Sequence, residues 1–162
     1  MPAHSVKARS HRLRIGRQSV PGQAYLLTFT TRERRPIFSG FDAACLVART
    51  LAAASNWPHA GLLAWVLMPD HWHGLVQLDG GEGLSRCVAR AKAAATRAWH
   101  DAHGNTDPLW APGFHDHGLR AEASVQQVAR YIVLNPVRAG LARRCGAYPF
   151  WDAVWLEHGR GG

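Results

Sequence analysis

Two apolar runs separated by only two residues constrain the fold of this chain more than any other feature. The runs span residues 62–68 and 71–78, and Pro69 and Asp70 are the only residues between them. Both runs are short and bounded by turn residues, so each is predicted to be a β-strand. Because a two-residue connection joins neighbouring antiparallel strands, we expect the two runs to form a β-hairpin.

Strand-like and helix-like segments alternate along the rest of the chain. Aromatic and β-branched residues predict strands at 24–31 and 114–122, and apolar residues at helical spacing predict helices at 41–56 and 84–103. This order is typical of the α+β class and its ferredoxin-like split βαβ fold (βαββαβ), a four-stranded antiparallel sheet with two helices on one face. The other face is left open for a site or a further helix.

A last helix is predicted at 124–135, and it carries Tyr131. Ser124 is its expected N-cap, and Pro136 is positioned to end or kink it. The chain of 162 residues fits one domain. Within it we expect a basic arm at 1–23, a catalytic domain at 24–150 and a tail at 151–162.

The charge balance of the chain is strongly basic. Lysine plus arginine number 19 against 11 acidic residues, which gives a net charge of +8. Only Lys7 and Lys92 are lysines, so arginine carries most of the positive charge. A guanidinium group can donate two hydrogen bonds to the oxygens of one phosphate. A polyanion, above all a nucleic acid, is therefore the expected partner.

Cysteine usage and hydropathy indicate the compartment. The three cysteines form no CxxC pair, which argues against a disulfide framework or a zinc knuckle. No apolar run approaches the roughly 20 residues that span a bilayer, and the N-terminal segment lacks the apolar core of a secretory signal. We expect a cytoplasmic, nucleoid-associated protein with no membrane partner, and a monomer in preference to a homodimer.

The second strand of the hairpin begins with His-Trp-His. Since side chains alternate along a strand, His71 and His73 are predicted to share one face while Trp72 points to the other. Two imidazoles at this spacing can converge on one divalent cation and leave coordination positions free. Two solvated histidines on an exposed sheet face are the alternative when the pattern is read alone.

The helix at 124–135 supplies a second pair of polar side chains. Tyr131 and Asn135 stand at i and i+4, which places a phenol and an amide oxygen on one helix face. Arg138 follows with a cation suited to phosphate. A core tyrosine followed by a C-terminal asparagine is the structural alternative for this pair.

The two segments together contain the groups of a metal-assisted phosphoryl transfer to tyrosine. A divalent ion held by His71, His73 and Asn135 would polarise a phosphate oxygen. Tyr131 would be the nucleophile, and its weakly acidic phenol would need the metal, an arginine or a histidine to help remove its proton. The product would be a phosphotyrosine and a free 3′-hydroxyl.

These residues carry a resemblance to a known family. "HWH" resembles the HUH motif, in which U is a bulky hydrophobic residue, and "YIVLNPVRAGL" resembles the tyrosine helix of single-tyrosine HUH transposases. "YLLTFTTRERRPIF", "WVLMPDHWHGLVQL" and "LWAPGFHDHGLR" match further blocks of the REP-associated tyrosine transposases in order. The resemblance covers residues 12 to 150, and it is specific because four separate blocks agree.

The resemblance implies a ferredoxin-like transposase that cleaves and rejoins single-stranded DNA at palindromic hairpin repeats through a 5′-phosphotyrosine. It implies dependence on Mg or Mn, with His71, His73 and Asn135 as metal ligands and Tyr131 as nucleophile. The family often has asparagine before the first histidine, where this chain has Asp70. Whether Asp70 binds the metal, orients a ligand or shapes the turn is left open.

Other polar residues are candidates for lining the site or binding DNA. A second His-X-His lies on the strand at 114–122, where His115 and His117 form a second metal site, line the first site or have a structural role. Asp116 between them is either site-lining or paired with Arg120. Site-lining candidates are Asp70, His115, Asp116, His117 and Arg138. Candidate DNA contacts are Arg12, Arg14, Arg34, Arg35, Arg90, Lys92 and Arg120.

Two other functions fit parts of the sequence. One is a domesticated, non-catalytic protein that binds hairpin DNA on the same fold. The other is a metal-dependent nucleotide phosphohydrolase, which gives Tyr131 no task and has Leu75 where a third alternating histidine would stand. A nicking assay on single-stranded hairpin DNA distinguishes all three.

Overall fold

A computed structural model of the chain describes residues 22–120 and 122–155, without the side chains of residues 122 and 123. The strands are β1 (Ala24–Thr30), β2 (Ala60–Met68), β3 (His71–Leu78), β4 (His115–Leu119) and β5 (Trp151–Ala153). The α-helices are α2 (Phe41–Ala52), α3 (Leu84–His103), α4 (Glu122–Val133) and α5 (Asn135–Arg138). Four short 3-10 turns complete the elements, namely Arg32–Arg34, Ile37–Ser39, Ala54–Asn56 and Cys145–Ala147. The basic arm, with Arg12 and Arg14, lies almost entirely outside the described residues.

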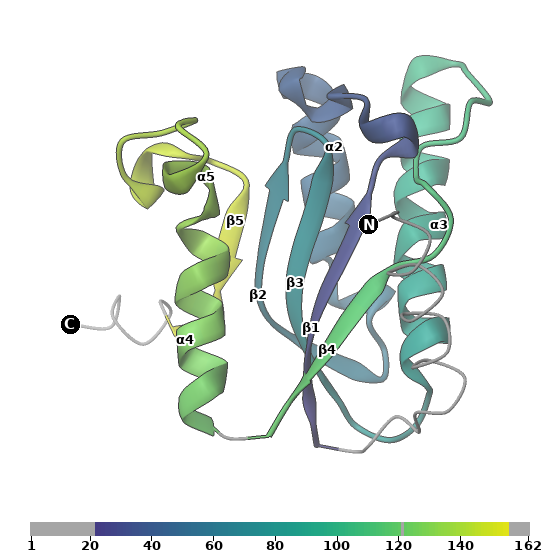
Figure 1. Cartoon of the computed structure of the whole chain (residues 1–162). Coiled ribbons are helices and arrows are strands. Elements are labelled where there is room, and N and C mark those ends of the chain that lie inside the picture. The colour runs from purple at the N-terminus through teal and green to yellow at the C-terminus, as the bar shows by residue number, and fades with distance from the viewer. Residues whose placement is uncertain (1–21, 121, 156–162) are drawn as a thin grey trace, which may run out of the picture.

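One antiparallel sheet with the strand order β4-β1-β3-β2-β5 forms the centre of the fold. Helices α2 and α3 cover one face of the sheet, and α4 lies over the other (Figure 1). The first four strands and both covering helices confirm the predicted α+β class. The sheet has five strands where the sequence predicted four, because Trp151–Ala153 pairs with residues 64–66 of β2. The face left for a site or a further helix carries α4 (Figure 1), the helix that contains Tyr131.

The predicted hairpin is present and brings β3 into the middle of the sheet. Met68 pairs with His71 at the turn, and Pro69 and Asp70 are the two turn residues. β3 also pairs with β1 along its other side, so every residue from His71 to Gln77 has a partner on β1. A strand held on both sides is a rigid support for the side chains that it carries.

Apolar residues pack on both faces of the sheet. On the α2 and α3 side, Leu27, Phe29 and Val76 are buried with Trp72. On the α4 side, a smaller cluster contains Val66, Leu75, Ala129 and Ile132. The alternation along β3 therefore matches the prediction, with Trp72 in the larger core and its two neighbours on the opposite face.

Trp72 is fully buried in the larger core. Its ring stacks on Phe29 with centroids 4.8 Å apart and on Trp57 with centroids 5.7 Å apart. The indole lies across Gly74, where an added Cβ would come within 1.9 Å of the ring. Trp72 thus fixes the strand that carries both histidines of the HWH motif.

Three predicted boundaries differ from the structure. The helix expected at 41–56 ends at Ala52, and residues 54–56 form a separate 3-10 turn. The strand expected at 114–122 is confined to His115–Leu119. Helix α4 begins at Glu122, so Ser124 lies inside its first turn and the prediction of Ser124 as N-cap is wrong.

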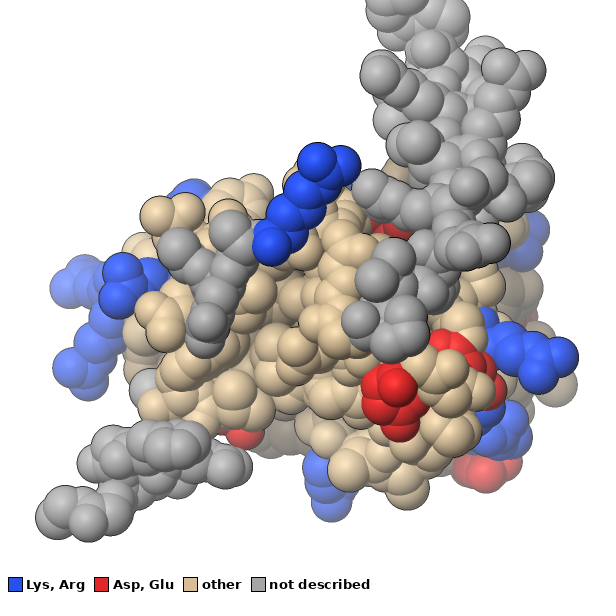
Figure 2. Space-filling view, turned by 90° about the horizontal axis from the view of Figure 1, so that it is seen from below, with Lys and Arg blue, Asp and Glu red and all other residues tan. Residues whose placement is uncertain are grey.

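Within the described residues, no helix combines the length and the apolar character needed to cross a lipid bilayer. The view from below in Figure 2 shows Lys and Arg side chains projecting around the rim of the molecule. Most of the acidic side chains visible there gather on the α3 side.

Candidate metal and nucleophile site

β3 places His71 and His73 together on the sheet face toward α4. Their ring centroids lie 4.6 Å apart, and the ring planes are almost perpendicular, at 80°. Both rings are partly buried, while Trp72 between them points into the opposite core. The strand geometry thus brings the two imidazoles close enough to share one ligand.

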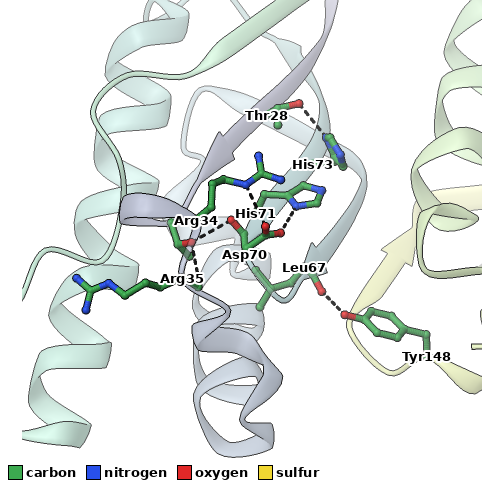
Figure 3. A network of polar contacts seen from close by, with 9 residues as sticks. Thr28, Arg34, Arg35, Leu67, Asp70, His71, His73 and Tyr148 are labelled. Carbon is green, nitrogen blue, oxygen red and sulfur yellow. Dashed lines mark hydrogen bonds and ion pairs between the residues drawn. The ribbon is translucent and has the colours of Figure 1, made fainter. Parts of the chain in front are cut away.

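Each imidazole is held at its Nδ1 atom by a neighbouring side chain (Figure 3). Nδ1 of His71 lies 2.7 Å from Oδ1 of Asp70, and Nδ1 of His73 lies 2.8 Å from Oγ1 of Thr28. A carboxylate only accepts a hydrogen bond, so Nδ1–H of His71 is the donor. With Nδ1–H of His73 as donor to Thr28, both rings present Nε2 as the free ligand atom.

The loop after β1 holds Asp70 in place. Nε of Arg34 donates to Oδ2 of Asp70 over 3.0 Å, and the buried Thr31 donates from its hydroxyl to the carbonyl oxygens of Asp70 and Arg35. Glu33 and Arg34 both adopt a left-handed φ of 56°. Left-handed backbone costs a non-glycine residue about 1–2 kcal/mol, so the contacts of Arg34 and Thr31 stabilise a strained loop against the histidine strand.

Burial and charge keep His73 neutral. Burial, followed by the positive charges of His71, Arg138 and Arg34, lowers the pKa of His73 to about 4. Burial would raise the pKa of Asp70, but the hydrogen bond and charge of His71, together with Arg34, lower it overall. A metal ligand requires a neutral imidazole, as at His73, and an ionised carboxylate such as Asp70 is a suitable orienting partner for the neighbouring ring of His71.

The donor set suits a divalent cation that keeps open coordination positions. The two rings lie 4.6 Å apart, and their Nδ1 atoms contact oxygen atoms of Thr28 and Asp70, the usual arrangement of metal-binding histidines. Within the described residues, no third His, Cys, Asp or Glu completes a metal-binding cluster. A cation here would therefore need an amide oxygen, water or phosphate oxygen as further ligands.

Tyr131 lies on α4, the helix that packs over the same sheet face as the two histidines. Its side chain is 53% exposed, unlike Ala129 and Ile132 beside it, which are buried against the sheet. The guanidinium carbon of Arg138 lies 3.9 Å from the centre of the Tyr131 ring. An exposed phenol under a cation is accessible to a large substrate, and the alternative of a core tyrosine does not hold.

The helix breaks between Tyr131 and Asn135. Leu134 separates α4 from α5, and Asn135 begins α5, with Pro136 directly after it. The predicted kink at Pro136 is therefore present, since proline cannot donate the hydrogen bond that would continue α4. The break places Arg138 where it contacts Tyr131 and contributes to the low pKa of His73.

The second His-X-His lies on β4, two strands away from the first. Thr28 on β1 pairs with His73 on one side and with His115 on the other, so His115 shares the face of His73. His115 and His117 are exposed, and Asp116 between them is half-buried. These positions make His115 an extension of the same polar face, and the roles proposed for His115 and His117 stay predictions.

The remaining cations predicted to bind DNA have different surroundings. Arg34, Arg35 and Arg120 are exposed. Arg90 forms a two-pronged contact with Glu82, and Nζ of Lys92 donates to the carbonyl oxygens of Ala111 and Gly113. Arg90 and Lys92 thus have structural partners, and their contact with DNA stays a prediction.

Thr28 and Thr31 are the polar residues of the site that the sequence did not single out. Both come from the strand and loop of "TFTT", some 40 residues or more before their partners. Side chains alternate between the two faces of β1, so the sequence could have predicted that Thr28 lies on the more polar face of the strand. Its pairing opposite His73 depends on the β1–β3 register, which one sequence does not reveal.

The chain is similar to transposases over most of its described length. Residues 19–135 match the protein-family model described as "Transposase IS200 like". A curated REP-associated tyrosine transposase of Escherichia coli (strain K12) is 28% identical over 88 residues, which are 54% of this chain and 50% of that protein. This match thus spans half the length of the curated relative.

Two solved structures share the fold. One is a REP-associated tyrosine transposase bound to a REP hairpin, with a TM-score of 0.68 and 23% identity over 90% of this chain and 84% of that chain. The other, from Deinococcus radiodurans R1, is described as a candidate transposase. It has a TM-score of 0.50 and 23% identity over 72% of this chain and 93% of that chain.

Proposed function

The chain belongs to the IS200-like transposase family, and on that premise we propose that it cleaves and rejoins single-stranded DNA at palindromic hairpin repeats. The reaction proceeds through a 5′-phosphotyrosine on Tyr131 and uses one divalent metal, Mg or Mn. The observation that carries the proposal is the pair of imidazoles, 4.6 Å apart, on the sheet face that α4 covers, with Tyr131 exposed on that same helix.

His71 and His73 hold the metal through Nε2, and Asn135 contributes its amide oxygen. Asp70 and Thr28 orient the two rings in this proposal, and their contacts with Nδ1 of His71 and His73 support that role. When bound, the cation supplies Lewis-acid polarisation of a non-bridging phosphate oxygen. The neutral state of His73 supports this role, because a protonated imidazole has no lone pair to offer.

Tyr131 is the nucleophile. Its phenolic oxygen loses a proton and forms a bond to the phosphorus, and the bond between phosphorus and the 3′-oxygen breaks. The departing 3′-oxygen takes up a proton and becomes a free hydroxyl. Rejoining reverses these steps, with a 3′-hydroxyl attacking the phosphotyrosine. The exposed position of Tyr131 allows a DNA strand to approach it.

Hairpin DNA is the proposed substrate. One solved relative is described as bound to a REP hairpin, and the net charge of +8 suits a polyanion. Exposed Arg34 and Arg35 are next to the loop that supports Asp70, so they are placed to contact phosphates close to the metal site.

The test is a cleavage assay on labelled single-stranded hairpin DNA with Mn. Wild type is expected to give a protein–DNA adduct on a denaturing gel and a free 3′-hydroxyl end, and Tyr131→Phe is expected to give neither. Hairpin binding by Tyr131→Phe is expected to be largely retained. An adduct that survives this substitution would falsify the role of Tyr131. Hairpin binding without cleavage by wild type would indicate the non-catalytic alternative, and a free 5′-phosphate without adduct would indicate a phosphohydrolase.

A further inference from the structure

We propose that a cavity between α4 and the far end of the sheet is a nucleobase-binding subsite. It would select a base in the single strand next to the phosphate that Tyr131 attacks. The cavity has a volume of about 750 Å³, and its lining includes Gln77, Arg120, Gln126 and Trp155. This subsite rests on the proposed function for its role, while its existence is testable separately.

The cavity lies on the sheet face that carries the histidines. Gln77 is on β3 and shares the face of His73, because the two residues are four positions apart and side chains two or four positions apart point the same way. Gln126 is on α4, five residues before Tyr131, which corresponds to about 7.5 Å along the helix axis. The cavity and the histidine pair thus lie on one sheet face, with about 13 Å between Gln77 and His73 along β3, so a DNA strand that runs along this face passes both.

The lining offers hydrogen-bond donors and acceptors beside an aromatic ring. Nε2 of Gln77 donates to the carbonyl of Gly22 over 2.8 Å, which leaves its amide oxygen as an acceptor. Gln126 is exposed, and its side-chain amide has no hydrogen-bond partner among the described residues. Glutamine amides pair with the donor and acceptor edges of bases, and an indole such as that of Trp155 provides a stacking surface.

Size and charge also favour a base with its phosphate attached. Pockets for small molecules measure about 300–1,000 Å³, so a cavity of this volume accommodates a nucleotide. Arg120 contributes a cation, and none of the described lining residues is acidic. In Figure 2, which looks onto this end of the molecule, most visible acidic side chains lie on the α3 side, away from α4.

The first experiment tests the subsite without any cleavage. The four deoxynucleoside 5′-monophosphates and 2-deoxyribose 5-phosphate are titrated into the full chain, and NMR follows the Gln126 amide and the Trp155 indole. At least one nucleotide is expected to shift both signals saturably, while the sugar phosphate does not. Gln126→Ala is expected to weaken the Trp155 response about fivefold, the effect of one lost hydrogen bond. Gln127 is the adjacent exposed glutamine and lies outside the cavity, so Gln127→Ala is the matched control. It is expected to leave the Trp155 response unchanged.

Two results of this titration would overturn the proposal. Equal shifts with the sugar phosphate would mean a phosphate site without base recognition. Absence of a saturable shift with all four nucleotides would mean that the cavity is no base site, whatever else fills it.

The second experiment tests the role of the subsite in selecting DNA. Wild type, Gln126→Ala and Gln127→Ala react with single-stranded DNA of random sequence and Mn, and the DNA in the covalent adducts is sequenced. Wild type and Gln127→Ala are expected to enrich one base at one position near the cleavage point, and Gln126→Ala is expected to lose that enrichment alone. Adducts with unchanged enrichment would refute the subsite and leave the proposed function intact. No adduct with any protein would refute the proposed function, and the titration would then decide on the subsite.

Discussion

The Arg138 guanidinium covers the ring of Tyr131, with 3.9 Å between its central carbon and the ring centre. The same guanidinium donates a hydrogen bond to the backbone carbonyl of Tyr131. The two contacts come from one side chain, so Arg138 fixes the orientation of the ring relative to its own helix. In the proposed reaction, a cation at this distance would also stabilise the negative charge that develops on the phenol oxygen.

Arg138→Gln is expected to slow adduct formation at saturating DNA by about fivefold, because a cation–π contact at an exposed site contributes about 0.5–1 kcal/mol and the charge near the phenol is lost as well. The rate is measured in a single turnover by quenching into denaturant. Arg143→Gln is the control, since Arg143 is an exposed arginine beyond α5 with no contact to Tyr131. Equal slowing by both substitutions would show a general charge effect and contradict the contact.

Asp70→Ala is expected to weaken Mn binding about 10- to 100-fold, the usual effect of removing an orienting partner of a metal-binding histidine. Asp70→Asn keeps an oxygen acceptor for Nδ1–H of His71 and is expected to stay within a few-fold of wild type. Calorimetric titration with Mn measures both. Arg34→Gln removes the other hydrogen-bond partner of the Asp70 carboxylate and leaves the contact with His71 in place. Its effect on Mn affinity therefore shows how much of the change in Asp70→Ala comes from the loop. Unchanged affinity in Asp70→Ala would contradict the orienting role.

Gly74→Ala is expected to reduce the free energy of unfolding by about 1–3 kcal/mol, as overpacking of a core does. The new methyl group would come within 1.9 Å of the Trp72 ring, which cannot withdraw because Phe29 and Trp57 stack on it. Denaturant unfolding measures the change. Gly61→Ala on β2 is the control, because no atom lies within 4 Å of its added Cβ. It is expected to be neutral or to stabilise the chain by up to about 1 kcal/mol.

The contact between Glu82 and Arg90 predicts a pH-dependent part of the stability. Hydrogen bonds from Arg90 lower the pKa of Glu82 to about 2, from an ordinary value of 4.5. A lowered carboxyl pKa stabilises the fold above pH 4.5, and this contribution is lost as the pH falls toward 2. The difference in melting temperature between wild type and Glu82→Gln is therefore expected to be largest above pH 4.5 and to shrink below it. A constant difference across this range would show that the ion pair does not contribute.

The elements that could be predicted from the sequence are those with strong local signals. Helix α3 matches its predicted range because glycine stands directly before and after it, and Gly104 adopts the left-handed conformation that ends helices. The hairpin follows from its two-residue turn. β5 was missed because three residues give no alternation, and their strand conformation depends on pairing with β2. The end of α2 was placed too late because alanine-rich sequence favours helix up to Pro58, while the chain leaves the helix at Ala52.

The candidate site also contains features that could be predicted from the sequence and features that could not. The shared face of His71 and His73 could be predicted, since it depends only on strand alternation. The partners of their Nδ1 atoms have different origins. Asp70 is a neighbour in sequence, whereas Thr28 is 45 residues away and meets His73 through the strand register. The contact between Arg138 and Tyr131 depends on the break at Leu134, whose geometry a single sequence does not specify.

The short strand β5 also influences how the protein behaves among other chains. It pairs with only residues 64–66 of the nine-residue β2, at the edge of the sheet. An edge strand of three residues offers few free backbone groups to an incoming chain, and long exposed edges are templates for aggregation. The segment expected from sequence to be a tail thus covers the middle of the β2 edge with a strand too short to act as such a template.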